Sequence, residues 1–244
     1  MSNRENHRGG NIAWRLLQRL RNYELWELFA LFAIAGALWL FAAIASEVRD
    51  GNTRAFDRTA LLALRDPTNP SDPIGPHWLE EVARDITSLG GTTVVTLLTI
   101  AVAGFLALTR RRSDALLVIA SIAGGAVFSA VLKLGFDRPR PDLVPHAVDV
   151  YSSSFPSGHA MLSTITYLTL GALLARVQTQ RRVKVYLLSW AVAITALVGA
   201  SRVYLGVHWP TDVLAGWCVG SAWAMLCGSV ALRMKSTRDK KIDC

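Results

Sequence analysis

Six long segments of this 244-residue sequence contain no charged residue. Each has about 16 to 20 residues, close to the ~20 that a helix needs to cross a hydrocarbon core about 30 Å thick. The segments are Leu28–Ser46, Thr92–Thr109, Ala115–Leu132, Ala160–Ala175, Val185–Ser201 and Val213–Leu232. A soluble core rarely supplies six such runs in one short chain. The sequence therefore predicts an all-α, polytopic membrane bundle with six transmembrane helices, formed by one domain over residues 1–244.

Cysteine is scarce as well. Cys218 and Cys227 lie within the sixth run and Cys244 ends the chain, and none of them has a metal-ligand spacing. They are most simply packing residues. The sequence also lacks internal repeats and low-complexity tracts, so repeat architectures are excluded.

The first uncharged run raises the question of a cleaved signal peptide. Ala43-Ile44-Ala45 fits a small-residue cleavage pattern. However, the run is longer than a usual signal-peptide core, and the polar leader of residues 1–24 is long for a signal peptide. We therefore favour an uncleaved helix.

Acidic residues are the minority: 18 stand against 26 basic ones, for a net charge of +8. Most basic residues fall in four segments: the leader 1–24, the links 110–112 and 176–184, and the tail 233–244. In a six-span protein these segments share one side, which the positive-inside rule makes cytoplasmic. The basic excess is thus a topology signal, and nucleic-acid binding is not expected.

The opposite, outer side receives the links Glu47–Gly91, Lys133–His159 and Arg202–Asp212. In the first of these, the stretch "NPSDPIGP" separates two segments with apolar residues at helical spacing. Short amphipathic helices on the outer membrane face are one interpretation. Solvated loop helices without lipid contact fit equally well.

The link "SRVYLGVHWPTD" gathers Arg202, His208 and Asp212 at the edge of a predicted span. Pro210 is a favourable first residue for a helix. Asp212 follows His208 by about one helical turn, so its carboxylate can accept a hydrogen bond from one ring nitrogen and leave the other free as a nucleophile or base. Taken alone, such a pair is more typical of a structural helix cap.

The second outer link makes an anion site the better interpretation. It carries "KLGFDRPRPDL" from Lys133, then "SFPSGHAM", in which Ser157 can cap a helix and Gly158 lets an anion approach its free N–H groups. Lys133, Arg140 and Arg202 would supply positive charge. Each residue has an ordinary structural explanation by itself, but together they favour a bound phosphate.

These blocks resemble the type 2 phosphatidic acid phosphatases, or lipid phosphate phosphatases. That family's pattern is Lys, six residues, Arg-Pro; then Pro-Ser-Gly-His; then Ser-Arg, five residues, His, three residues, Asp. The present sequence has Lys133 with Arg140-Pro141, then Pro156-Ser157-Gly158-His159, then Ser201-Arg202 with His208 and Asp212. All three blocks are complete and in order between residues 133 and 212. Arg138 lies in a variable gap of the first block, and we assign it no catalytic role.

The resemblance implies a mechanism. His208 would be the nucleophile that forms a phosphohistidine, Asp212 would orient it, and His159 would protonate the leaving oxygen. Lys133, Arg140, Ser157, Gly158 and Arg202 would hold the phosphoryl oxygens. We expect no metal and no other cofactor, because the outer links lack a carboxylate cluster of the kind that holds magnesium.

The expected substrate is a membrane lipid with a phosphate headgroup, entering the site from the outer face of the cell membrane. Candidates are undecaprenyl diphosphate, phosphatidylglycerol phosphate, phosphatidic acid and lipid A phosphates, and we favour an isoprenoid diphosphate or broad tolerance. No obligatory protein partner is evident. The alternatives are a lipid phosphotransferase with the same site, a vanadate-dependent haloperoxidase, which six spans disfavour, and a non-catalytic lipid carrier.

Overall fold

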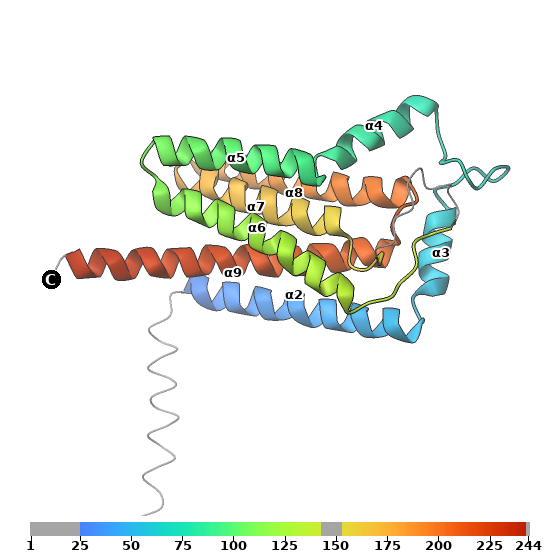
Figure 1. Ribbon diagram of the computed structural model, residues 1–244, viewed down its shortest axis with the longest axis horizontal. Coiled ribbons are helices and arrows are strands. Elements are labelled where there is room, and N and C mark those ends of the chain that lie inside the picture. The colour runs from blue at the N-terminus through green and yellow to red at the C-terminus, as the bar shows by residue number, and fades with distance from the viewer. Residues whose placement is uncertain (1–24, 143–152, 243–244) are drawn as a thin grey trace, which may run out of the picture.

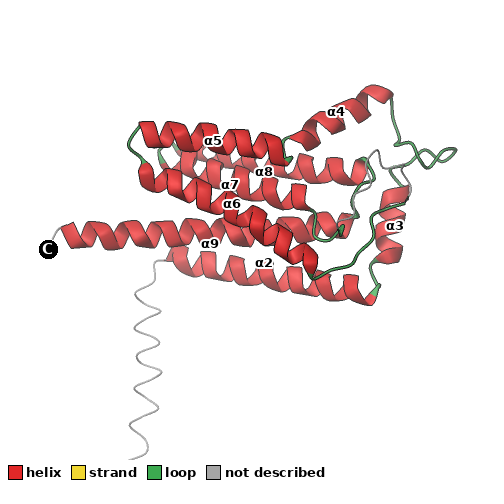
Figure 2. Cartoon of the chain, viewed as in Figure 1, coloured by secondary structure: helices red, strands yellow, loops and turns green. Residues whose placement is uncertain are grey.

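The computed structural model describes residues 25–142 and 153–242, and these form helices joined by turns and loops (Figure 2). Apart from one isolated bridge between Arg65 and Pro73, these residues contain no β-structure. The helices are α2 (Leu25–Asp50), α3 (Arg54–Leu62), α4 (His77–Ser88), α5 (Thr92–Leu108), α6 (Arg112–Leu134), α7 (Gly158–Arg176), α8 (Arg181–Tyr204) and α9 (Pro210–Ile242). The predicted all-α class is confirmed.

The long helices run side by side along one axis (Figure 1). Three links, residues 51–91, 135–157 and 205–209, meet at one end of the bundle, which we call the site end. The short links 109–111 and 177–180 lie at the other end, together with the C-terminal end of α9. Helix α7 packs against α6, α8 and α9, and it carries more buried residues than the others. All three predicted sequence blocks therefore reach the site end around one central helix.

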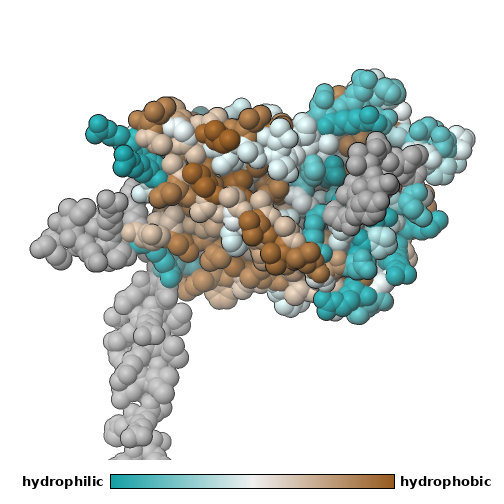
Figure 3. Space-filling model, in the orientation of Figure 1, coloured by the Kyte–Doolittle hydropathy of each residue, from teal (hydrophilic) through white to brown (hydrophobic). Residues whose placement is uncertain are grey.

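The surface along the bundle is strongly apolar (Figure 3). Large side chains point outward from it, such as Phe32 at 77% exposure and Trp39 at 72%. Hydrophilic residues gather instead at the site end, near α3 and α4. Exposed aromatic and aliphatic surface of this extent marks contact with lipid in a bundle of this length. The chain is a multi-pass membrane protein.

Five helices, α2, α6, α7, α8 and α9, are long and apolar enough to cross a bilayer. The predicted second span corresponds to α5, which has only 17 residues. It reaches a spanning length only together with α4, from which it is bent by 46° at Leu89–Gly91. The structure thus supports five spans, or six if this bent pair is one.

Both helix starts expected at the site end are confirmed. Helix α9 begins at Pro210. Helix α7 begins at Gly158, with Ser157 as its N-cap: the Ser157 hydroxyl accepts from the N–H of Ala160 at 3.5 Å. The Ser157 N–H in turn donates to the Asp212 carbonyl at 3.0 Å, which fastens the start of α7 to the first turn of α9.

The predicted long first link holds α3 and α4. That they are amphipathic helices on the outer membrane face stays a prediction. The predicted leader of residues 1–24 lies outside the described residues. At the other terminus, α9 continues to Ile242, through most of the segment predicted as a tail. The two described cysteines, Cys218 and Cys227, are free thiols.

Candidate active site

The centre of the site is the predicted pair of His208 and Asp212. His208 lies in the short link before α9, and Asp212 lies in the first turn of that helix. Nδ1 of His208 is 3.4 Å from Oδ2 of Asp212, and both side chains are almost fully buried. Oδ2 also accepts the backbone N–H of Trp209 at 2.9 Å. The carboxylate is therefore held in place by the turn that carries the histidine.

The position of Arg140 indicates which ring nitrogen of His208 carries no proton. Its Nη1 lies 3.5 Å from Nε2 of His208 and donates to the Val207 carbonyl at 3.2 Å. A guanidinium can only donate, so Nε2 presents a lone pair to it and the ring proton resides on Nδ1, facing Asp212. The nitrogen that faces the arginine is thus the one able to act as a nucleophile.

Burial lowers the pKa of His208 from 6.5 to about 4, against the opposing effect of Asp212; the charges of Arg202 and Arg140 lower it further. The ring is consequently neutral at physiological pH. Burial also lowers the pKa of Arg140, and Asp212 opposes this change. The ordinary pKa of an arginine is so high that the Arg140 guanidinium stays protonated even after this decrease. A neutral imidazole beside permanent cations suits attack on an anionic phosphate.

The start of α7 supplies the second predicted block. An added Cβ at Gly158 would lie 3.9 Å from Nζ of Lys133, so Lys133 reaches across this helix start. The ring of His159 lies against the break between α4 and α5. A Cβ added at Gly91 would lie 3.8 Å from its Nε2. His159 interacts electrostatically with His208, Arg202, Lys133 and Arg140. Free N–H groups and cations therefore meet at one place, as an anion site requires.

The remaining predicted cations are anchored by groups outside the sequence blocks. Lys133 donates to the Ser153 carbonyl at 3.2 Å. Arg202 donates through Nη1 to the Thr87 hydroxyl of α4 at 3.2 Å, while its buried Nε has no hydrogen-bond partner among the described residues. Each cation thus keeps donor capacity for a further acceptor.

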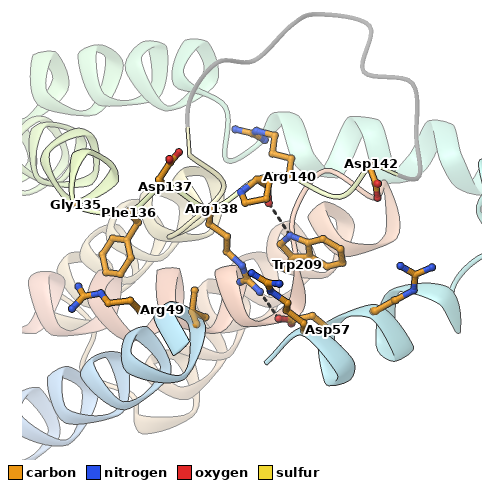
Figure 4. A pocket seen from close by; sticks show the side chains of 13 residues that line it. Arg49, Asp57, Gly135, Phe136, Asp137, Arg138, Arg140, Asp142 and Trp209 are labelled. Carbon is orange, nitrogen blue, oxygen red and sulfur yellow. Dashed lines mark hydrogen bonds and ion pairs between the residues drawn. The ribbon is translucent and has the colours of Figure 1, made fainter. Parts of the chain in front are cut away.

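Two residues outside the predicted set join the site. Arg138, to which the sequence assigned no role, donates to Oδ1 of Asp212 at 2.5 Å and to Oδ2 of Asp57 at 2.5 Å. Asp57 belongs to α3, and Figure 4 shows it beside Arg138. The only sequence signal for Arg138 was its position two residues before Arg140 in a Pro-rich turn. Asp57 had none.

A pocket of about 620 Å³ opens next to these residues (Figure 4). Its walls combine Phe136 and Trp209 with the ends of α2 and α3. Five arginines line it: Arg49, Arg54, Arg58, Arg138 and Arg140. Because Arg140 also faces His208, the pocket adjoins the His208–Asp212 pair.

No group of three or more His, Cys, Asp or Glu side chains within residues 25–142 and 153–242 is arranged to hold a metal ion. The metal-free mechanism expected from the sequence remains a prediction.

Comparison with known proteins identifies the family. The family model of the PAP2 superfamily matches residues 114–235, which include every predicted site residue. Phosphatidylglycerophosphatase B of Bacillus subtilis (strain 168) is 32% identical over 221 residues, which are 89% of this chain and all of that protein. The chain belongs to the PAP2 superfamily.

A second sequence relative and a solved structure are also similar to this chain. An undecaprenyl-diphosphatase of Sulfolobus acidocaldarius is 37% identical over 43% of this chain and 46% of its own length. The crystal structure of a transmembrane PAP2 type phosphatidylglycerolphosphate phosphatase from Bacillus subtilis superposes with a TM-score of 0.72 at 29% identity, over 83% of this chain and 97% of that one. The chain is accordingly a membrane phosphatase, a hydrolase of phosphoric esters.

Proposed function

We propose that this PAP2 protein hydrolyses the phosphate or diphosphate of a membrane lipid through a phosphohistidine on His208. The observation that carries the proposal is the buried His208 ring, with Nδ1 at Asp212 and Nε2 at Arg140. The relatives support a lipid substrate: they include a phosphatidylglycerophosphatase, an undecaprenyl-diphosphatase and a lipid A 1-phosphatase.

In the first step Nε2 of His208 attacks phosphorus and the bond from phosphorus to the lipid oxygen breaks. The leaving oxygen takes a proton from the His159 imidazolium, which becomes neutral, and Asp212 stabilises the positive ring that forms on His208. In the second step a water attacks the phosphohistidine, its proton passes to His159, and inorganic phosphate leaves with His208 neutral again. Protons and charge balance over the two steps.

The phosphoryl oxygens would lie among Lys133, Arg140, Arg202 and the start of α7 at Ser157 and Gly158. Charge spreads over these oxygens in the loose transition state of phosphoryl transfer, so fixed cations and N–H donors lower its energy. Arginine offers two parallel donors to a phosphate, and lysine acts as a point charge.

The proposed orientation has six spans, with α4 and α5 together forming the second, and both termini in the cytoplasm. The site then faces the outer side of the cell membrane. Basic residues in the links at the other end support this orientation through the positive-inside rule. Helix α3 would lie at the outer interface, where the headgroup enters while the lipid tail stays in the bilayer.

The arginine-lined pocket supports a preference for a lipid with two phosphate groups. Arg49, Arg54 and Arg58 line it without an ion-pair partner among the described residues. Unpaired arginines on the outer side run against the charge distribution of the rest of the chain. A second phosphate beside the scissile one would satisfy them.

The test of this preference compares farnesyl diphosphate with farnesyl phosphate, which share one tail. For the Arg54→Gln/Arg58→Gln variant, kcat/KM should fall about tenfold more on the diphosphate than on the monophosphate, as expected for lost hydrogen bonds to charge. Arg84→Gln, on α4 and away from the pocket, is the matched control. An equal loss on both substrates would contradict a second phosphate subsite.

The test of the main proposal is phosphate release in detergent with EDTA present, using undecaprenyl diphosphate, phosphatidylglycerol phosphate and phosphatidic acid. The parent should release phosphate, His208→Ala should release none, and acid-labile phosphate should appear on the parent protein only. Release that requires an added acceptor lipid would identify a transferase instead. Equal release by parent and variant would refute His208 as the nucleophile.

A further inference from the structure

Arg138 links two carboxylates that are far apart in the sequence. Its Nη1 donates to Asp212, and to the Thr211 hydroxyl at 2.8 Å. Its Nη2 donates to Asp57 and to the Thr53 hydroxyl at 3.2 Å. The guanidinium therefore uses its planar fork, one arm toward the His208 partner and one toward α3.

Asp57 is buried even more deeply than the arginine it binds. Its side chain is 1% exposed, against 11% for Arg138. Besides Arg138, it accepts the Thr211 N–H at 3.0 Å and the Thr211 hydroxyl at 2.7 Å. A carboxylate at this depth would be very costly without such donors. Asp57 thus holds both the arginine and the residue immediately before Asp212.

These contacts form a continuous chain from Asp57 through Arg138 and Asp212 to His208. Asp212 accepts from three directions: Arg138 on Oδ1, and the Trp209 N–H and His208 on Oδ2. With both oxygens engaged, the carboxylate has one orientation, and so has the ring that donates to it. Arg138 also lies over the Trp209 ring, 5.8 Å from its centre.

We propose that Arg138 and Asp57 are positioning residues for the nucleophile, through which helix α3 of the long first link holds the His208–Asp212 pair in its reactive geometry. This inference rests on the proposed function, in which His208 attacks phosphorus. Neither residue touches the reacting atoms. Their removal should slow the chemical step and leave lipid binding largely unchanged.

Substitutions of Arg138 and Asp57 should shift the pH profile of kcat/KM in opposite directions. The part that shifts is its acidic limb, where activity falls as His208 becomes protonated. Arg138 partly neutralises Asp212, so Arg138→Gln strengthens the pull of Asp212 on the imidazolium and moves the limb to higher pH. Asp57 partly neutralises Arg138, so Asp57→Asn moves the limb to lower pH. The other groups facing the pair stay unchanged in both variants: Lys133 on α6, His159 on α7, Arg202 on α8 and Arg140 on the 135–157 link.

The experiment measures kcat, KM and the pH profile of kcat/KM for the detergent-solubilised full chain, with thermal unfolding as the check on folding. The variants are Arg138→Gln, Asp57→Asn and their double mutant, with Arg84→Gln as the control. Arg84 also pairs with a carboxylate, Glu80, on a helix at the site end, but the pair has no link to Asp212. His208→Ala and the parent are run alongside.

Arg138→Gln should lower kcat by about 10-fold to 100-fold, the range known for outer partners that orient a metal-bound histidine. KM should stay within about threefold, and Asp57→Asn should cost less in the Arg138→Gln background than in the parent, because both act through one chain. Should Arg138→Gln fail to fold, Arg138→Lys keeps the charge, loses the fork and should still lower kcat.

A rise in KM with kcat intact would overturn the inference and make Arg138 a substrate-binding residue. Additive losses, or acidic limbs that stay in place in both variants, would overturn it as well. An inactive parent, or an active His208→Ala, would instead refute the proposed function, so the two failures are distinguishable.

Discussion

At the scale of single residues, the burial of His208 sets the acid side of the pH range. Burial lowers its pKa from 6.5 to about 4. A nucleophilic nitrogen must carry no proton. We therefore expect kcat/KM, corrected for the lipid's own titration by ³¹P NMR, to persist as the pH falls through 6.5 and to decline only toward pH 4. A midpoint near 6.5 would mean that His208 titrates as a solvated imidazole.

Asp212 provides the second prediction at this scale. Asp212→Asn removes the charge that stabilises the imidazolium, and its amide presents either a donor or a weaker acceptor to Nδ1. We expect kcat to fall about 10²-fold to 10⁴-fold, as in other histidine–aspartate pairs, with little change in KM. Rapid-quench measurement of phosphohistidine formation checks this. Asp114→Asn, at the other end of the bundle, should leave the rate unaltered.

At the scale of helices, the packing of α7 on α9 sets the distance between His159 and His208, the two histidines of the proposed mechanism. Gly216 on α9 makes this approach possible: an added Cβ would lie 2.7 Å from the Ser157 carbonyl oxygen and 3.0 Å from the Ala160 Cβ. Neither backbone nor Cβ atoms can move aside without shifting α7. The start of α7, with His159, would then move relative to His208.

We accordingly expect Gly216→Ala to lower the free energy of unfolding by about 1–3 kcal/mol, as for other overpacked positions, and to reduce activity with it. The matched control is Gly228→Ala, further along the same helix, where nothing lies within 4 Å of the added Cβ. That variant should keep both stability and activity. Thermal unfolding and phosphate release, measured on both, check the contrast.

Much of this geometry follows from local sequence. Pro210 and Ser157 identify two helix starts, because the requirements of a first helical turn concern only neighbouring residues. Arg138 and Asp57 could not be paired in this way, since 81 residues separate them and no periodicity connects a loop arginine to a short helix. The bend before α5 was also missed: an uncharged run indicates apolar surroundings and carries little information on where a helix changes direction.

At the scale of the whole molecule, charge and hydropathy are arranged along the bundle axis. The apolar surface surrounds the long helices, and the hydrophilic residues cluster at the site end (Figure 3). The other end carries Arg110, Arg111 and Arg112 in one link and Arg181 and Arg182 at the next. This polarity leads to the proposed orientation, and it makes α5 the element on which the number of spans depends.

Single cysteines in a background without the three native ones test that orientation. Asn69→Cys, in the link at the site end, should react with a membrane-impermeant maleimide in intact cells. Thr179→Cys and Thr109→Cys, exposed in the two links at the other end, should react only after permeabilisation. Labelling of Thr109→Cys together with Asn69→Cys in intact cells would contradict the proposed six spans, because the structure places link 109–111 at the end of the bundle opposite Asn69. Labelling of both Thr109→Cys and Thr179→Cys in intact cells, with Asn69→Cys unlabelled, would reverse the protein in the membrane and place the phosphatase site in the cytoplasm.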